Sequence, residues 1–420
     1  MAGDGVGARC GRIAVMQMMA LFLVLMLAAC ASLPSQGYPV PGAAALPGAA
    51  DKAALRVLYV TDRAPRDLPG GLAYDTARNP SMALGQAILA RRARGQAERR
   101  LSYRLTALEE WRRFPPTPVP FSARDGRILP EPEAQAAYDA AARDFQTRIA
   151  RAMRVSGRDE VLIYIHGFNS QFRHAAATLA EIWAATDRRT LPLAYTWPAG
   201  NPGPFGYFKD RESGDFSVFH LKETLRLLAG VKGLRAMHIV AHSRGAEVAT
   251  EALRERIIAV RASGGNALRS LKVRNLVLAA PDLDFGVVRQ RLLAERFGPA
   301  FGRITVYMNP EDDALGLAQT LLTGQRFGRL SLDDLRPAER RIFRSIGNVD
   351  FINVSAVAVG SSHGYFRDNL EVRGDIVTLL STDAPPGDPA RTRNLQHEGA
   401  NFWRLLTPTD LARVLPDVER

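Results

Sequence analysis

Cysteine is almost absent from this sequence, and its scarcity excludes several kinds of site. The two cysteines, Cys10 and Cys30, both lie in the first thirty residues. The rest of the chain therefore has no disulfide, no thiolate nucleophile and no cysteine-ligated metal. The sequence also lacks a long block of Lys or Arg and the mixture of basic and aromatic residues that is typical of nucleic-acid binding. We therefore expect no nucleic-acid partner.

The overall composition is that of a globular domain in contact with water. Hydrophobic residues make up 46% of the 420 residues and charged residues 23%, which allows a sizeable core. The formal net charge of +12 comes mostly from scattered arginines. Two interpretations of this charge remain open: a basic solvated surface, or attraction to an acidic surface such as anionic lipid head groups.

The N-terminus has the layout of a secretory signal. Two arginines precede an apolar run over 13–29, which is short for a spanning helix and has no basic cluster after it. The run ends in Leu27–Cys30 (LAAC), which resembles a bacterial lipobox and implies that Cys30 is lipidated. An ordinary signal peptide with an incidental cysteine is the alternative. Because Ala31 and Ser32 follow and no Asp does, the lipoprotein pattern implies a lipid anchor in the envelope of a Gram-negative cell, at the periplasmic face of the outer membrane.

Four segments are expected along the chain. Residues 1–29 are the signal peptide, and 30–50 form a tether rich in Pro, Gly, Ala and Ser. Residues 51–380 form the folded domain, and 381–420 form a peripheral, Pro-rich and polar tail. The oligomeric state is left open.

An α/β fold is predicted from the rhythm of the folded domain. The first part holds a strand at 55–61, little regular structure over 62–100, a second strand at 101–108 and a helix over 131–153. From about residue 159, apolar strands alternate with helices, which predicts a mostly parallel sheet covered on both faces. The strands are expected at 161–165, 193–197, 237–241, 273–279, 304–308 and 350–354, and the helices at 175–186, 216–228, 245–260, 287–297, 315–322 and after 364.

The segment Ala241-His242-Ser243-Arg244-Gly245 joins a predicted strand to a predicted helix. A sharp strand-to-helix turn exposes a serine hydroxyl beside backbone N–H donors, and it demands small residues two before and two after the serine. The sequence therefore predicts that Ser243 is a nucleophile. Its alternative role is an ordinary helix N-cap.

A second segment, His166-Gly167-Phe168-Asn169, directly follows another predicted strand. Preorganised N–H groups stabilise the negative charge that develops on a carbonyl oxygen during acyl transfer. We expect the backbone N–H groups of Phe168 and Arg244 to be these donors, with Gly167 allowing close approach of the backbone.

The general base is expected at His363, which follows the last predicted core strand in a Ser-Ser-His-Gly loop. This position satisfies the order serine, acid, histidine of α/β hydrolases. The acid remains open from the residues alone, because several carboxylates follow the two preceding strands and two of these could instead cap a helix. The candidates are Asp282, Asp284, Glu311, Asp312 and Asp313.

Together these motifs resemble a bacterial α/β-hydrolase family of unknown function, number 900, which is esterase- or lipase-like. The resemblance covers roughly residues 55–380 and implies a triad of Ser243, Asp312 and His363. At Arg244 the family usually has Met or another apolar residue, and the hypothesis that follows is that a cation at this position favours anionic substrates. The shared motifs are VTDR (60–63), HGFN (166–169), YTWPAG (195–200), AHSRG (241–245), APDLDF (280–285), D-x-A-L (312–315) and SSHG (361–364).

The expected activity is that of a serine esterase acting on a small-molecule or lipid ester through an acyl-enzyme, with no metal and no organic cofactor. An acyltransferase on the same triad and a non-catalytic envelope lipoprotein with a vestigial triad are the alternatives. The segment 200–212 (GNPGPFGYFKDRE) is expected to be a loop, and it either lines the pocket or covers it, or is an ordinary surface loop.

Overall fold

The computed structural model describes residues 54–69, 71–92, 102–358, 362–390 and 392–414. Within them lies an 11-stranded sheet. Its strands, in spatial order, are β12 (Leu395–Gly399), β13 (Phe402–Leu405), β11 (Val349–Asn353), β10 (Arg303–Met308), β9 (Val273–Ala279), β8 (Ala236–His242), β6 (Glu160–Ile165), β7 (Leu191–Thr196), β1 (Leu55–Leu68), β2 (Gly71–Arg91) and β3 (Tyr103–Arg113).

The predicted α/β fold is confirmed. The strands from β13 to β1 in this order all pair in parallel, whereas β12, β2 and β3 add antiparallel pairs at the two edges. Every strand predicted after residue 159 is present, within two residues of its expected bounds. These strands are apolar on both sides because helices cover both faces of the sheet.

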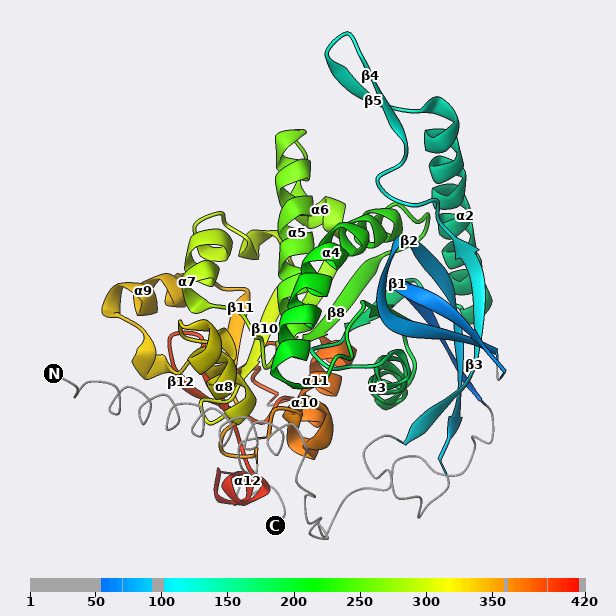
Figure 1. The fold of residues 1–420 in the computed structure, drawn as a ribbon. Coiled ribbons are helices and arrows are strands. Elements are labelled where there is room, and N and C mark those ends of the chain that lie inside the picture. The colour runs from blue at the N-terminus through cyan, green and yellow to red at the C-terminus, as the bar shows by residue number, and fades with distance from the viewer. Residues whose placement is uncertain (1–53, 70, 93–101, 359–361, 391, 415–420) are drawn as a thin grey trace, which may run out of the picture.

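Alternation of side chains along β6 divides the core into two layers. Val161 and Ile163 belong to one hydrophobic cluster, which also holds residues of α2, α4 and α5, while Leu162 and Tyr164 face a second cluster with residues of α3, α10 and α11. Figure 1 shows α4 and α5 crossing one face of the sheet. The helices are α2 (Pro132–Ser156), α3 (Phe172–Ala185), α4 (Gly203–Ala229), α5 (Arg244–Ala262), α6 (Ala267–Leu271), α7 (Phe285–Val287), α8 (Asp313–Leu322), α9 (Pro337–Ser345), α10 (Tyr365–Asp368), α11 (Leu370–Thr382) and α12 (Pro408–Val414).

Short helical turns fill several connections. The expected helix at 287–297 is instead α7 followed by a π-helical turn, η1 (Val288–Leu293). The other turns are the 3₁₀ turns η2 (Gly298–Ala300), η3 (Phe327–Arg329) and η4 (Leu332–Asp334).

The prediction of little regular structure over 62–100 is wrong. β1 continues to Leu68 and pairs with the long strand β2, with register shifts between Thr61 and Pro65. This ribbon lies near the edge of the sheet, where Pro80 and exposed polar residues are tolerated, so it lacks the apolar pattern of a central strand. The strand expected at 101–108 is β3, which extends to Arg113.

The prediction of a loop over 200–212 is also wrong beyond its first three residues, because α4 already begins at Gly203. The Gly and Pro residues that suggested a loop lie at the start of the helix, where Pro is tolerated in the first turn. Asp210, in the third turn of the helix, is fully buried and accepts hydrogen bonds from the N–H groups of Asn169 (2.8 Å) and Gly200 (3.1 Å). The start of α4 is thereby fixed against two strand-end loops.

The C-terminal segment, expected to be peripheral, contributes two strands to the edge of the main sheet. β13 pairs in parallel with β11, and Phe402 is buried against Phe351, with ring centroids 4.6 Å apart. Arg393, which is buried, forms an ion pair of 2.7 Å with the buried carboxylate of Asp375 in α11. The prediction of a peripheral segment was wrong because it relied on the pattern of apolar residues, and this segment is held partly by a buried ion pair.

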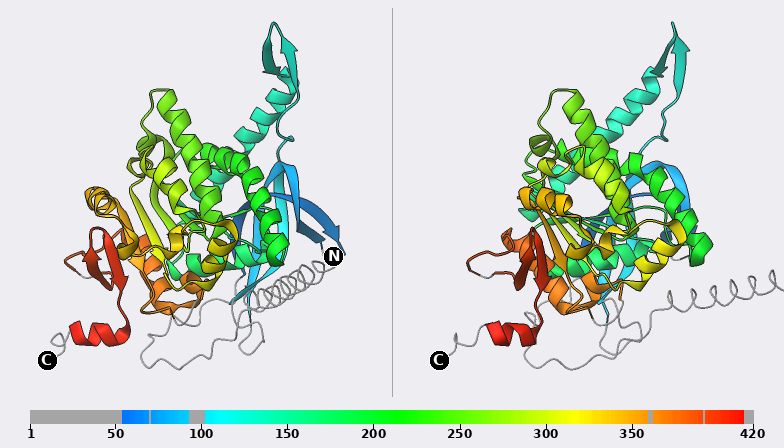
Figure 2. Two further views of the ribbon diagram at one scale, coloured as in Figure 1. Left: turned by 60° about the vertical axis from the view of Figure 1, so that its left-hand side comes forward. Right: turned by 90° about the vertical axis from the view of Figure 1, so that its left-hand side faces the viewer.

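A separate two-stranded hairpin of β4 (Phe121–Arg124) and β5 (Arg127–Pro130) extends beyond the body of the domain next to α2, as both views in Figure 2 show. Among the described residues, no helix is long and apolar enough to cross a bilayer. The predicted signal peptide, Cys30 and the tether lie outside the described residues.

Candidate active site

Ser243 lies at the turn between β8 and α5 with φ 53° and ψ −126°. This backbone conformation is unfavourable for a residue with a side chain, and it is typical of a strained functional turn. A Cβ atom on Gly245 would lie 2.2 Å from the carbonyl oxygen of His166, so only glycine fits there. The Ser243 side chain makes no capping hydrogen bond to α5, which removes the N-cap alternative.

The HGFN loop packs directly on Ser243. A Cβ atom on Gly167 would lie 2.7 Å from the Cβ atom of Ser243. The backbone N–H of Phe168 donates no hydrogen bond to any described residue. Arg244 is the first residue of α5, so its N–H has no acceptor within the helix. Both predicted oxyanion donors therefore remain available, one on the HGFN loop and one at the start of α5, next to Ser243.

The motif around Arg63 fixes the loop that carries Phe168. The buried guanidinium of Arg63 donates to the carbonyl oxygens of Ser170 (2.7 Å) and Ala199 (2.7 Å) and lies 3.2 Å from Nε2 of His166. Trp197 stacks on the His166 ring and donates from Nε1 to the His166 carbonyl oxygen at 2.7 Å. The role of the two motifs VTDR (60–63) and TWP (196–198) is therefore to hold this loop in place.

His166 is held in its neutral form. Burial, together with the positive charge of Arg63, lowers the pKa of His166 to about 3. Nε2 of His166 lies against Arg63 and its Nδ1 lies 3.0 Å from the carbonyl oxygen of Gly167, so both ring nitrogens are engaged within the loop and its packing.

His363 and Asp312 lie side by side. Nδ1 of His363 is 2.7 Å from Oδ2 of Asp312, whose side chain is fully buried. The other carboxylate oxygen of Asp312 accepts the N–H of Leu315 at 3.0 Å and so caps α8. The helix start thereby holds the carboxylate in a fixed orientation toward the imidazole.

The pKa values of His363 and of the neighbouring His242 are shifted in opposite directions. Burial acts to lower the pKa of His363, but the charge of Asp312 and its hydrogen bond outweigh burial, so that the pKa is raised. The pKa of His242 is well below its ordinary value because of burial and the charge of His363. His242 stacks on Phe366, with ring centroids 4.4 Å apart, and supports the loop that carries His363.

The other candidate acids are engaged elsewhere. Asp284 accepts the N–H of Val287 at 2.9 Å and caps α7. Asp282 accepts a hydrogen bond of 2.6 Å from the hydroxyl of Tyr207 and is buried beside two arginines. Glu311 and Asp313 are exposed. Of the five carboxylates left open by the sequence, Asp312 is the one that meets His363.

Sequence reasoning missed Tyr207 and Arg326, which the fold brings to the start of α5. Arg326 Nη1 lies 3.6 Å from Oδ1 of Asp282, and the ring of Tyr207 lies 5.3 Å from that of Phe168. Tyr207 was assigned to a loop, and Arg326 belongs to none of the recognised motifs, so the sequence held no signal for their meeting.

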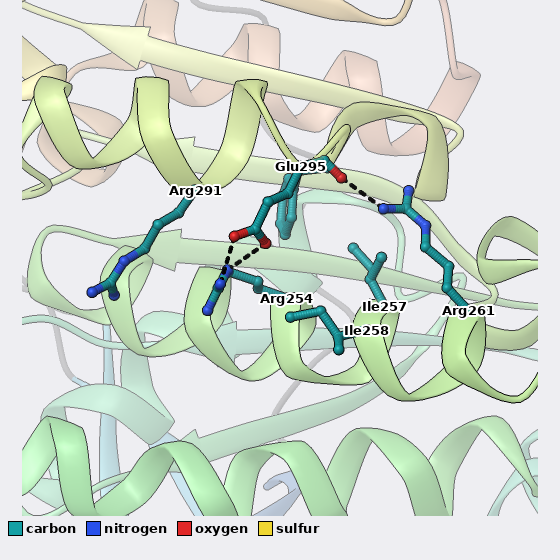
Figure 3. A pocket seen from close by; sticks show the side chains of 7 residues that line it. Arg254, Ile257, Ile258, Arg261, Arg291 and Glu295 are labelled. Atoms are coloured by element: carbon teal, nitrogen blue, oxygen red, sulfur yellow. Dashed lines mark hydrogen bonds and ion pairs between the residues drawn. The ribbon is translucent and has the colours of Figure 1, made fainter.

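A pocket of about 240 Å³ lies elsewhere, between α5 and the segment after η1. Figure 3 shows Glu295 at its centre, bonded to Arg254 and, through its carbonyl oxygen, to Arg261. Arg254 is about 15 Å along the helix from its start, at 1.5 Å per residue. This pocket is therefore separate from Ser243, and its arginines are already paired. Its lining residues are Arg254, Ile257, Ile258, Arg261, Arg291, Glu295 and Phe297.

Among the described residues, no group of three or more His, Cys, Asp or Glu side chains is placed to hold a metal ion. What the arrangement offers is a serine, a carboxylate-linked imidazole and two backbone N–H groups at one edge of the sheet.

The family to which the sequence is matched agrees with this architecture. A family model described as "Alpha/beta hydrolase of unknown function (DUF900)" matches residues 141–382, more than half of the chain. A solved structure of a lipase-esterase related protein from Clostridium acetobutylicum is 8% identical, covers 47% of this chain and 74% of that chain, and has a TM-score of 0.18. So loose a structural match carries no argument. No curated protein matches the chain.

Proposed function

This chain belongs to the family of α/β hydrolases of unknown function (DUF900), and from that premise we propose that it is a serine carboxylesterase with Ser243, His363 and Asp312 as its triad. One observation carries the proposal: the 2.7 Å contact between His363 and Asp312, at the same edge of the sheet as the strained turn at Ser243.

The reaction is acyl transfer to water. Oγ of Ser243 attacks the ester carbonyl carbon while Nε2 of His363 takes the hydroxyl proton. The carbonyl oxygen becomes an oxyanion, which accepts hydrogen bonds from the N–H groups of Phe168 and Arg244. Collapse of this intermediate breaks the bond to the alkoxy group, which leaves as an alcohol with the proton from His363.

Water completes the cycle. His363 takes a proton from a water molecule as that water attacks the acyl-enzyme, and it returns the proton to Oγ of Ser243 when the carboxylic acid leaves. Asp312 stays ionised throughout and stabilises the imidazolium form of His363.

Active-site labelling tests the proposal directly. A fluorophosphonate probe should label the full chain, and it should fail to label Ser243→Ala. The same substitution should abolish hydrolysis of short nitrophenyl esters. Retention of either signal in Ser243→Ala refutes the triad, and absence of both in the unmodified chain favours a non-catalytic lipoprotein.

We also propose that lipidated Cys30 anchors the protein at the periplasmic face of the outer membrane. Stable anchoring needs more than one acyl chain, and the lipobox-like sequence Leu27–Cys30 supplies the attachment point. Cells grown with labelled palmitate should incorporate the label into the chain but not into Cys30→Ser. Equal labelling of both, or of neither, contradicts the anchor.

A further inference from the structure

A cluster of paired charges adjoins the candidate nucleophile. Nη1 of Arg244 lies 2.5 Å from Glu247 and 3.9 Å from Asp282, and Nη1 of Arg326 lies 3.6 Å from Asp282. The side chains of Arg244, Asp282 and Arg326 are only 3%, 3% and 5% exposed. The backbone N–H of Asp282 donates to the carbonyl oxygen of Ser243 at 3.2 Å, so the cluster contacts the turn itself.

The hydrogen-bonding capacity of this cluster is incompletely used. Nη2 of Arg244 and Nε of Arg326 are buried without a hydrogen-bond partner among the described residues, and so are Oδ1 of Asp282 and Oε2 of Glu247. Buried polar groups are almost always hydrogen-bonded, because the desolvation of an unbonded one is not compensated. Two donors and two acceptors beside the nucleophile therefore favour the binding of a further polar group.

The charges decide which kind of group fits. Two guanidinium groups face two carboxylates, Glu247 and Asp282, so the cluster has no net charge to attract an anion. This argues against the anionic substrates that Arg244 alone suggested. A hydroxyl group both donates and accepts hydrogen bonds, so it can donate to Asp282 and accept from an arginine.

The chain itself already places one hydroxyl on the cluster. Tyr207 donates from its hydroxyl to Oδ2 of Asp282 at 2.6 Å. Burial and the charge of Asp282 raise the pKa of Tyr207 far above its ordinary value, which keeps this hydroxyl protonated. The Tyr207 ring lies against the Phe168 ring and 5.8 Å from the Arg244 guanidinium, so it contacts the side chains of the two residues whose backbone N–H groups are the candidate oxyanion donors.

We propose that Arg244, Asp282 and Arg326 form a subsite for a hydroxyl group of the substrate, so that the enzyme acts on esters of polyols or of hydroxy acids in preference to plain alkyl esters. This inference rests on the proposed esterase function. A substrate hydroxyl takes the bonds that Asp282 and the two arginines leave unmade, next to the carbonyl that Ser243 attacks.

Two matched pairs of esters test the subsite with the full chain. Glycerol monobutyrate and propyl butyrate differ by hydroxyls on the alcohol side, and propyl 3-hydroxybutyrate differs from propyl butyrate by a hydroxyl on the acyl side. We expect kcat/KM to be at least about tenfold higher for one hydroxylated ester, because a site that loses a hydroxyl partner leaves buried polar groups unbonded. The pair that shows the preference identifies the side of the ester that the subsite reads.

Arg326→Met should reduce that preference to within about threefold of unity, because it removes the donors of one arginine. The ratio of two esters is insensitive to the fraction of folded enzyme. Arg289→Met is the matched control, since Arg289 pairs with Glu339 outside the cluster and its loss should leave the ratio unchanged.

Three outcomes overturn the subsite: equal kcat/KM values for each pair in the unmodified enzyme, a preference that survives in Arg326→Met, or a stronger preference for the anionic monopropyl succinate. If no ester is hydrolysed and the fluorophosphonate probe does not label Ser243, the proposed function fails and the subsite fails with it.

Discussion

The imidazole of His363 meets the carboxylate of Asp312 at 2.7 Å across a sequence separation of 51 residues. The two side chains come from loops after the neighbouring parallel strands β10 and β11. Because parallel strands end at the same edge of a sheet, the fold brings the two loops together, and the helix start at Leu315 orients the carboxylate.

Asp312→Asn should abolish most of the activity with little loss of stability. An asparagine can still accept the Leu315 N–H, but it cannot stabilise the imidazolium form of His363, and kcat should fall by about 1,000- to 10,000-fold. Ester hydrolysis and thermal unfolding measure the two effects. Asp284→Asn alters a similar helix cap away from His363, so near-normal activity in this control is required.

Activity should rise with pH through the titration of His363. The base must be neutral to accept the proton of Ser243, and Asp312 raises the pKa of His363 above 6.5. The inflection in kcat/KM should therefore lie above pH 6.5 and move to lower pH in Asp312→Asn, where burial still lowers the pKa of His363 and only the charge of Asp282 raises it. A pH profile of the residual activity gives the shift, and an unchanged inflection would argue that another group titrates.

Gly167→Ala should disable the enzyme without unfolding it. The added Cβ atom would lie 2.7 Å from Cβ of Ser243 and so displace the loop that carries the Phe168 N–H. Loss of one oxyanion donor lowers kcat by about 100-fold or more. Gly374→Ala is the control, because nothing lies within 4 Å of its Cβ position in α11; full activity is expected there.

Arg393→Met should destabilise the whole domain. It leaves the buried carboxylate of Asp375 without its positive partner, which costs about 3 kcal/mol or more. Arg404→Met removes one cation that is 32% exposed and lies 3.7 Å or more from its carboxylate partners, and it should cost less than about 1 kcal/mol. Denaturant unfolding compares them, and equal free energies of unfolding would mean that the C-terminal segment is not integral to the fold.

The positions of the central strands along the chain and their mostly parallel pairing were predictable, because their residues are continuous apolar runs separated by helices. The ribbon of β1 and β2 was not, since the last residues of β1 and the first half of β2 are exposed or half-buried and their residues are mixed in character. The strands β12 and β13 were not predicted for a related reason. They are short, and Arg393 anchors their segment through one buried ion pair.

The sequence by itself determined that the backbone turns sharply at Ser243 and that the HGFN loop approaches closely at Gly167. Both features depend on local crowding of the backbone, which the small residues at these positions indicate. Only the tertiary structure decided between the acids. Asp284 and Asp312 both cap a helix by accepting an N–H three residues later, so their local sequences look alike. The two differ in their position relative to His363. The parallel pairing of β10 and β11 places the loop of His363 next to Asp312.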